Sequence, residues 1–136
     1  MIAVPDLLIA RLKDQFKDVE GLLALSGFQD RQVSREKLFV VELSERPHGV
    51  VDGTGLYRQD MTLTLGVLLV LPAINCKTPD LTTPRNLVRQ LLFSWAPDPS
   101  LTPLALAGGQ LQPSRAGTVA WLDRFTTDYT EDANYA

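Results

Sequence analysis

The stretch Met61–Leu71 constrains the fold of this chain more than any other part of the sequence. Its first half alternates, with Met61, Leu63 and Leu65 on one side and threonines on the other, which is the period of a β-strand. From Val67 to Leu71 the residues are apolar on both sides. A strand of this kind is buried on both faces, so it belongs in the centre of a sheet. The rest of the chain must therefore supply neighbouring strands and covering layers.

Two amphipathic helices are predicted as the cover. Apolar residues recur at helical spacing over Asp6–Val19, and Pro5 stands where proline is tolerated at a helix start. The second helix spans Thr83–Trp95, with Thr83 as the N-cap and Pro97 ending it. Between the first helix and the next strand, Leu22–Phe28 is apolar but its type is ambiguous.

Further strands complete the sheet. Leu38–Leu43 is rich in β-branched and aromatic residues, and Leu104–Gln112 and Gly117–Thr130 are predicted to pair, with a Gly108-Gly109 turn. The aromatic residues of the last stretch are spaced by four, as in a helix, but its threonines favour a strand. The prediction is an α+β fold, with two helices packed on a mainly antiparallel sheet of four to five strands. One domain spans residues 1–136, with a long loop at 44–60 and a short polar C-terminal tail at 131–136.

Composition narrows the classes of function. A length of 136 residues suits one domain, and the net charge of −3 argues against tight, charge-driven binding of nucleic acid. No apolar run approaches the ~18 residues of a membrane span. A signal peptide is not expected, because the N-terminus lacks a basic region. The single cysteine, Cys76, cannot form an internal disulfide, which fits synthesis in the reducing cytoplasm.

The residues that usually carry chemistry do not form a catalytic pattern. His48 is the one histidine, and it reads as an ordinary loop residue or as a contact to a partner. Cys76 lacks an obvious base, and Asp52-Gly53-Thr54-Gly55 lacks the lysine of a phosphate loop. The carboxylates Asp123, Asp128, Glu131 and Asp132 fit a solvated face better than a pair for acid/base work. We therefore expect no enzyme, no metal and no cofactor.

The order of elements nevertheless carries a resemblance. It comprises the first helix, the strand Leu38–Leu43, the long loop, the strand Met61–Leu71 and a helix with the exit Ser94-Trp95-Ala96-Pro97. The chain ends with Leu104-Ala105-Leu106-Ala107-Gly108-Gly109-Gln110-Leu111 and the aromatic run Trp121-Leu122-Asp123-Arg124-Phe125 to Tyr129. Over nearly its whole length the chain resembles the tail terminator proteins of long-tailed bacteriophages, the minor tail proteins that cap the finished tail tube.

The resemblance implies a structural virion protein that forms a ring, a homo-hexamer, on the tail tube. Such a ring ends polymerisation of the tail tube protein and provides the head-joining surface for a head-completion or connector protein. The resemblance also implies a place in the virion tail, after synthesis in the host cytoplasm, with no sequence-specific nucleic acid and no membrane as partner. The alternatives are a head–tail connector or neck adaptor protein, a small cytosolic binding module, or an enzyme. Ring size and tail type, contractile or not, stay open.

Eight residues are candidates for contacts with partners or other subunits. We expect the long loop to meet the tail tube or the next subunit, and the two arginines of the second helix to bridge to acids of a neighbour. The long loop supplies His48, Val50, Tyr57 and Arg58, the second helix supplies Arg85 and Arg89, and the C-terminal stretch supplies Asp128 and Glu131.

Overall fold

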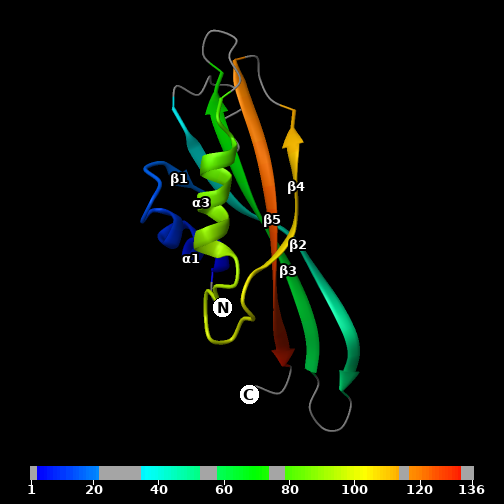
Figure 1. The fold of residues 1–136 in the computed structure, drawn as a ribbon. Coiled ribbons are helices and arrows are strands. Elements are labelled where there is room, and N and C mark those ends of the chain that lie inside the picture. Colours follow the sequence, from blue (N-terminus) through cyan, green and yellow to red (C-terminus); the bar gives the residue numbers. More distant parts are fainter. Residues whose placement is uncertain (1–2, 22–34, 53–57, 74–78, 114–116, 133–136) are drawn as a thin grey trace.

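A five-stranded mixed sheet forms the body of the protein. The computed structural model describes residues 3–21, 35–52, 58–73, 79–113 and 117–132, without the side chains of 50–52. In chain order the elements are α1 (Val4–Leu12), β1 (Val19–Glu20), β2 (Lys37–Asp52), β3 (Arg58–Pro72), α3 (Thr82–Leu92), β4 (Ala105–Gln112) and β5 (Thr118–Asp132) (Figure 1). The strand order is β1-β2-β3-β5-β4, antiparallel except for the short parallel pair of β1 and β2. The predicted α+β class is confirmed.

The predicted central strand is the centre of this sheet. β3 pairs with β2 on one side and with β5 on the other along its whole length, from Arg58 opposite Asp132 to Pro72 opposite Thr118. All of its residues from Leu65 to Leu71 are buried. The run that is apolar on both sides thus marks the segment where both faces of the sheet are covered.

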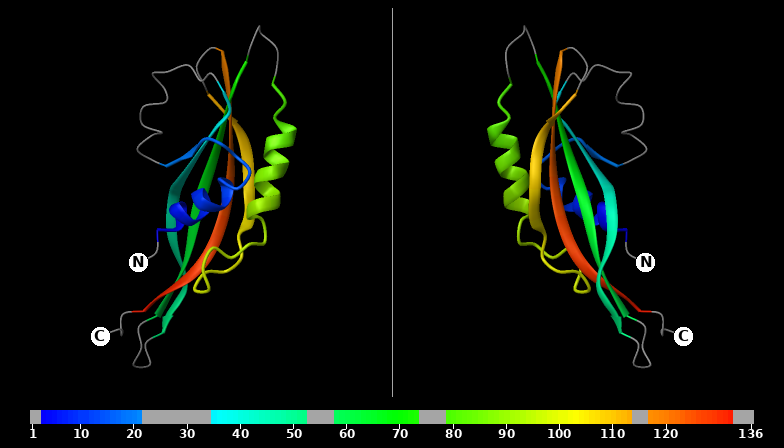
Figure 2. Two further views of the ribbon diagram at one scale, coloured as in Figure 1. Left: turned by 90° about the vertical axis from the view of Figure 1, so that its left-hand side faces the viewer. Right: turned by 90° about the vertical axis from the view of Figure 1, so that its right-hand side faces the viewer.

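The main core lies between the sheet and the two helices, with α3 alongside one face (Figure 2). Leu8 and Leu12 of α1, Val88 and Leu92 of α3, and Phe125 of β5 are all at most 1% exposed. The helices also hold each other, because the Arg11 guanidinium lies 4.6 Å from the centroid of the Trp95 ring and its Nε donates to the Leu91 carbonyl. A second, smaller cluster occupies the opposite face and consists of Phe39, Leu68, Val70, Ala120 and Leu122.

The first helix is shorter than predicted. It ends at Leu12, and Val19 is not helical but opens β1, opposite Leu38 of β2. Residues 13–18 are polar apart from Phe16, and Phe16 and Val19 are both buried. Their spacing matched a helix only because both reach the same core. The apolar segment 22–28 lies outside the described residues.

The predicted loop at 44–60 is wrong in its described parts, and residues 53–57 lie outside the described residues. Residues 44–52 continue β2 and residues 58–60 begin β3, with His48 opposite Asp60. The segment was predicted as a loop because it is mostly polar and rich in proline and glycine, whereas the usual strand signal needs one continuous apolar face. The polar tail is also shorter than predicted, since Glu131 and Asp132 belong to β5 and residues 133–136 lie outside the described ranges.

The second helix is confirmed, but its ends differ. Thr83 is not the cap; instead the Asp80 carboxylate accepts hydrogen bonds from the backbone N–H groups of Thr82 and Thr83 and from the Thr83 hydroxyl. These hydrogen bonds lower the pKa of Asp80. The helix ends at Leu92, and Ser94 takes the left-handed conformation with φ of 68°. The returning chain then fixes this exit, because the Ser94 N–H donates to the Leu104 carbonyl and the Leu104 N–H donates to the Trp95 carbonyl.

The predicted pair of C-terminal strands is confirmed as β4 and β5, but Gly108 and Gly109 do not form their turn. Both glycines lie inside β4, where the register shifts between Leu106 and Gly108. Gly108 has a φ of +112°, which side chains disfavour, so it permits this β-bulge.

Candidate subunit and partner interface

Three strands extend beyond the helices as an arm (Figures 1 and 2). We define the arm as residues 44–52 of β2, 58–64 of β3 and 126–132 of β5. The hairpin of β2 and β3 and the C-terminal end of β5 therefore run side by side, although about 70 residues separate them in sequence. Most arm side chains of β2 are exposed, so this part of the sheet is open to a partner.

Four of the predicted contact residues lie on the arm with their side chains described. His48 Nε2 is 3.9 Å from Asp128 Oδ1, across the sheet from β2 to β5. Arg58 stands at the start of β3, with its Nε 3.6 Å from Asp132 Oδ2, and Glu131 is exposed near the end of β5. Two further candidates are not visible in detail: the side chain of Val50 and the whole of Tyr57 lie outside the described part. The structure thus brings together residues that were selected from separate stretches.

The arm has two different faces. The back face, turned away from the helices, is polar and carries Ser44, Arg46, His48, Asp60, Thr62, Thr64, Thr126, Asp128 and Thr130. Hydrogen bonds tie much of it together, because Thr62 donates to Asp128 at 2.7 Å and Thr130 donates to Asp60 at 3.1 Å. Arg46 is exposed on this face, and within the described ranges no hydrogen bond or ion pair engages its guanidinium.

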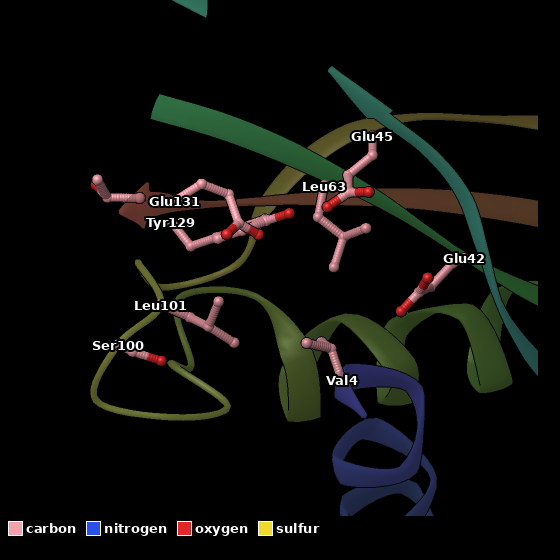
Figure 3. Close-up of a pocket in the computed structure, with 9 residues that line it drawn as sticks. Val4, Glu42, Glu45, Leu63, Ser100, Leu101, Tyr129 and Glu131 are labelled. Carbon is pink, nitrogen blue, oxygen red and sulfur yellow. The ribbon is translucent and has the colours of Figure 1, made fainter. Parts of the chain in front are cut away.

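The front face of the arm holds a pocket of about 190 Å³ (Figure 3). We call it the acidic pocket, because three carboxylates line it. β2 and β5 supply acids and Tyr129, the start of α1 supplies Val4, and the segment after α3 supplies Leu101. The full lining is Val4, Glu42, Glu45, Leu63, Ser100, Leu101, Tyr129, Thr130 and Glu131.

The segment after α3 is held firmly against the arm. Ser100 donates from its backbone and its hydroxyl to the Asp98 carboxylate, which lowers the pKa of Asp98. Thr102 donates its N–H to the Asp128 carbonyl at 3.0 Å, and the Thr127 hydroxyl donates to the Thr102 carbonyl at 2.6 Å. The wall of the acidic pocket that Ser100 and Leu101 form is therefore fixed by β5.

A β-bulge places two of the acids on the same side. Along a regular strand, residues three apart point to opposite faces. The register shifts between Glu42 and Ser44, so Glu42 lies opposite Leu65 and Glu45 lies opposite Leu63, both on the front face. The sequence did not indicate these two glutamates as a pair, because strict alternation would place them on opposite faces of the sheet. A hint of the bulge is the glycine at position 66 of the neighbouring strand. Its missing side chain leaves room for Leu43, the residue inside the bulge, because a Cβ at Gly66 would come within 2.9 Å of Leu43 Cδ1.

The arginines of α3 turn toward the sheet of their own chain. The Arg85 guanidinium lies 3.8 Å from the centroid of the Trp121 ring, and Arg89 Nη2 lies 3.5 Å from Asp123 Oδ1. Trp121 Nε1 donates to the same carboxylate oxygen at 2.9 Å. Asp123 is only 3% exposed, so its expected place on a solvated acidic face is wrong. The predicted bridge from Arg85 and Arg89 to a neighbouring subunit stays a prediction.

The free edge of β4 is the second surface open to a partner. β4 ends the sheet in the described structure and contains no charged residue. Leu106 and Leu111 on this strand, and Phe93 at the end of α3, are 44%, 60% and 53% exposed. Charges often protect edge strands, and β4, although it carries a bulge between Leu106 and Gly108, has none, so its apolar edge favours association.

Two classes of site are not found among the described residues. No group of three histidine, cysteine, aspartate or glutamate side chains comes together in an arrangement that could hold a metal ion. Within the same residues, no helix combines the length and hydropathy that crossing a membrane requires.

Comparison with known proteins identifies the family. The family model described as phage tail terminator protein matches residues 2–134, which is nearly the whole chain. A search of curated proteins finds no match. The chain belongs to the phage tail terminator family, and the resemblance drawn from its helix exit and terminal aromatic strand is confirmed. It is accordingly a structural protein of the phage tail and a component of the virion.

Proposed function

We propose that this phage tail terminator forms a closed ring on the end of the tail tube, stops further addition of tube protein and offers the surface for head joining. Membership of the family supports the position at the tube end. The arm supports the ring, because its β2 side chains from 44 to 49 are exposed on both faces while pairing of β2 with β3 and of β3 with β5 holds the three strands together.

A ring of identical subunits needs two different surfaces that fit each other. Such a head-to-tail contact closes when the rotation between neighbours divides a full turn evenly, and a hexamer is one solution. The arm offers two surfaces, a polar back face with the exposed Arg46 and a front face with the acidic pocket. The uncharged edge of β4 adds a place where a neighbouring chain can pair or pack.

The charge of the chain is compatible with DNA passing through such a ring. A net charge of −3 per subunit gives no overall attraction for the phosphate backbone. The proposed ring therefore surrounds DNA without gripping it.

Tube polymerisation in the presence of the purified protein tests this function. Tail tube protein is allowed to polymerise with and without the chain, and electron microscopy records tube length and the structure at each tube end. We expect short tubes of uniform length, each with a ring on one end. Tubes that grow equally long in both conditions and carry no ring refute the proposal.

A shortened arm tests which part of the chain makes the contact. Replacing residues 50–57 by Asn-Gly leaves a short hairpin connection, which suits antiparallel strands. The variant should fold, since the main core lies beside the helices, yet it should no longer limit tube length. The matched control replaces residues 114–116 by Asn-Gly, between β4 and β5 at the other end of the sheet, and should cap tubes normally. Normal capping by the arm variant excludes the arm tip as the contact.

A further inference from the structure

The acidic pocket has the composition of a receptor for a basic side chain. We propose that it receives the Arg46 side chain of a neighbouring copy, so that the back face of one arm binds the front face of the next around the ring. The inference rests on the proposed ring, and it names the residues that join the subunits.

The pocket combines negative charge with an apolar floor. Leu63 and Val4 are 5% and 6% exposed and form part of the floor, while Glu42, Glu45 and Glu131 are exposed around it. Arginine fits this combination, because its aliphatic stem packs on apolar surface while the guanidinium donates to carboxylates in several directions. The three acids make no ion pair within the described residues. They therefore offer charge that the described part of the chain does not neutralise.

The Tyr129 hydroxyl is a second and independent sign of a missing partner. Its oxygen is buried in the pocket wall and has no hydrogen-bond partner in the part of the chain that the structure describes. A buried hydroxyl without a partner is costly, and a donor entering the pocket would relieve that cost. A metal ion fits less well, since within the described residues no three acids converge closely enough to hold one.

Arg46 is the matching group on the other side of the arm. It follows Glu45 directly in β2, and the two point to opposite faces, since they lie opposite Thr62 and Leu63. Stacking the back of one arm on the front of the next therefore brings Arg46 level with a neighbour's pocket. Several other described cations are engaged within the chain: Arg35 with Asp18, Lys37 with Glu20, Arg58 with Asp132, Arg89 with Asp123 and Arg124 with Gln110. Lys13 and Lys17 are also exposed, but they lie between α1 and β1 and not on the arm.

Charge reversal tests the contact. Arg46→Glu and Glu45→Arg should each weaken ring formation by about tenfold or more, the size expected for a close charge pair at an interface. The double variant, Arg46→Glu with Glu45→Arg, should recover a large part of the loss, because the charges are exchanged on both sides. Tyr129→Phe should weaken the ring less, since it removes one acceptor and keeps the packing. Ring formation is measured by mass photometry over a range of concentrations, alone and on tube ends.

Matched controls separate this contact from a general effect of charge. Lys17→Glu and Asp14→Arg make the same changes at exposed residues between α1 and β1, near the start of β2 and away from the arm. Both should leave ring formation unchanged. Melting temperatures of the arm variants should stay near that of the unmodified chain, because Arg46 and Glu45 make no ion pair within the described residues.

Crosslinking gives a direct readout of the predicted neighbours. Chains carrying Arg46→Cys are mixed with chains carrying Glu131→Cys, both in a Cys76→Ser background, and are oxidised on capped tubes. We expect crosslinked pairs from the mixture and few from either chain alone.

The outcomes distinguish this inference from the proposed function. One outcome overturns the arginine contact but leaves the proposed ring standing. In that outcome rings form and cap tubes without giving the crosslink, and Arg46→Glu forms rings as well as Lys17→Glu does. A double variant weaker than both single variants also overturns it. An unmodified chain that neither forms rings nor caps tubes rejects the proposed function and this inference together.

Discussion

Gly109 offers a sharp test of how α3 is held to the sheet. It lies in β4 opposite Asp123, and a Cβ at this position would stand 2.5 Å from Asp123 Oδ1 and 2.9 Å from Trp121 Nε1. Carbon atoms of real side chains do not approach that closely. Gly109→Ala must therefore displace the carboxylate or push β4 away from β5.

The loss in the free energy of unfolding follows from the contacts that the Asp123 carboxylate makes. Moving Asp123 weakens the hydrogen bond from Trp121 at 2.9 Å and the contact with Arg89 at 3.5 Å. A hydrogen bond to a charged group contributes about 1.5–3 kcal/mol, and overpacking costs about 1–3 kcal/mol. Alanine recovers roughly 0.5–1 kcal/mol of unfolded-state entropy relative to glycine. We expect a net loss of about 2 kcal/mol in the free energy of unfolding, or roughly 5–10 °C in Tm for a chain of this size.

Urea denaturation followed by circular dichroism measures this loss, and a second substitution identifies its cause. Asp123→Ala removes the oxygen that the new methyl group meets, so Gly109→Ala should cost about 1 kcal/mol less in that background. Gly108→Ala is the control, because nothing lies within 4 Å of its Cβ and its cost comes from the φ of +112°. Its effect should be the same with Asp123 or Ala at position 123. A Gly109→Ala protein within about 0.5 kcal/mol of the unmodified chain, or strict additivity with Asp123→Ala, refutes the reasoning.

Three further substitutions test other parts of the structure. Hydrogen bonds lower the pKa of Asp80, so its contribution to stability is present above the ordinary aspartate pKa and is lost as the pH falls through that value towards the lowered one. The urea midpoint, measured from neutral pH to about pH 2, should therefore fall less steeply at acid pH in Asp80→Asn than in the unmodified chain. An identical pH dependence in the two proteins argues against the cap. Gly66→Ala should cost about 1 kcal/mol or less, because the atoms it meets are the ends of Leu43 and Leu122; an unfolded variant contradicts this. Arg89→Ala should lower the free energy of unfolding by about 1–3 kcal/mol at every protein concentration, since buried Asp123 loses its cation. A loss that depends on concentration would favour the predicted bridge between subunits.

Much of the core could be predicted because apolar residues report burial directly. Met61–Leu71 predicted the central strand because its second half is apolar on both faces, and the apolar stripe ending at Trp95 predicted α3 because it reflects one covered face of a helix. The order of these elements also carried the family resemblance, which the match over residues 2–134 confirms.

The arm escaped prediction for the same physical reason. Strand patterns are recognised by an apolar face, and the β2 side chains from 44 to 49 are exposed on both sides, so this stretch offers no apolar alternation. The acidic pocket was hidden further by the bulge between Glu42 and Ser44, which reverses the side on which Glu45 is expected. Arg85 and Arg89 were selected as contacts to a neighbouring subunit because charge predicts exposure, and the sequence did not show that they also pack against Trp121 and Asp123 of their own chain.

The C-terminal end of β5 is an integral part of the proposed interface. Glu131 and Tyr129 reach the acidic pocket only because β5 pairs with β3 as far as Asp132, beside Arg58 at the start of that strand. The same pairing places Asp128 where it meets His48 and the Thr62 hydroxyl on the back face. One strand thus contributes to both faces of the arm, and losing its last residue pairs with β3 would remove parts of both faces at once. The acids near the C-terminus therefore act as structural elements of the arm, and their position follows from the register of a single pair of strands.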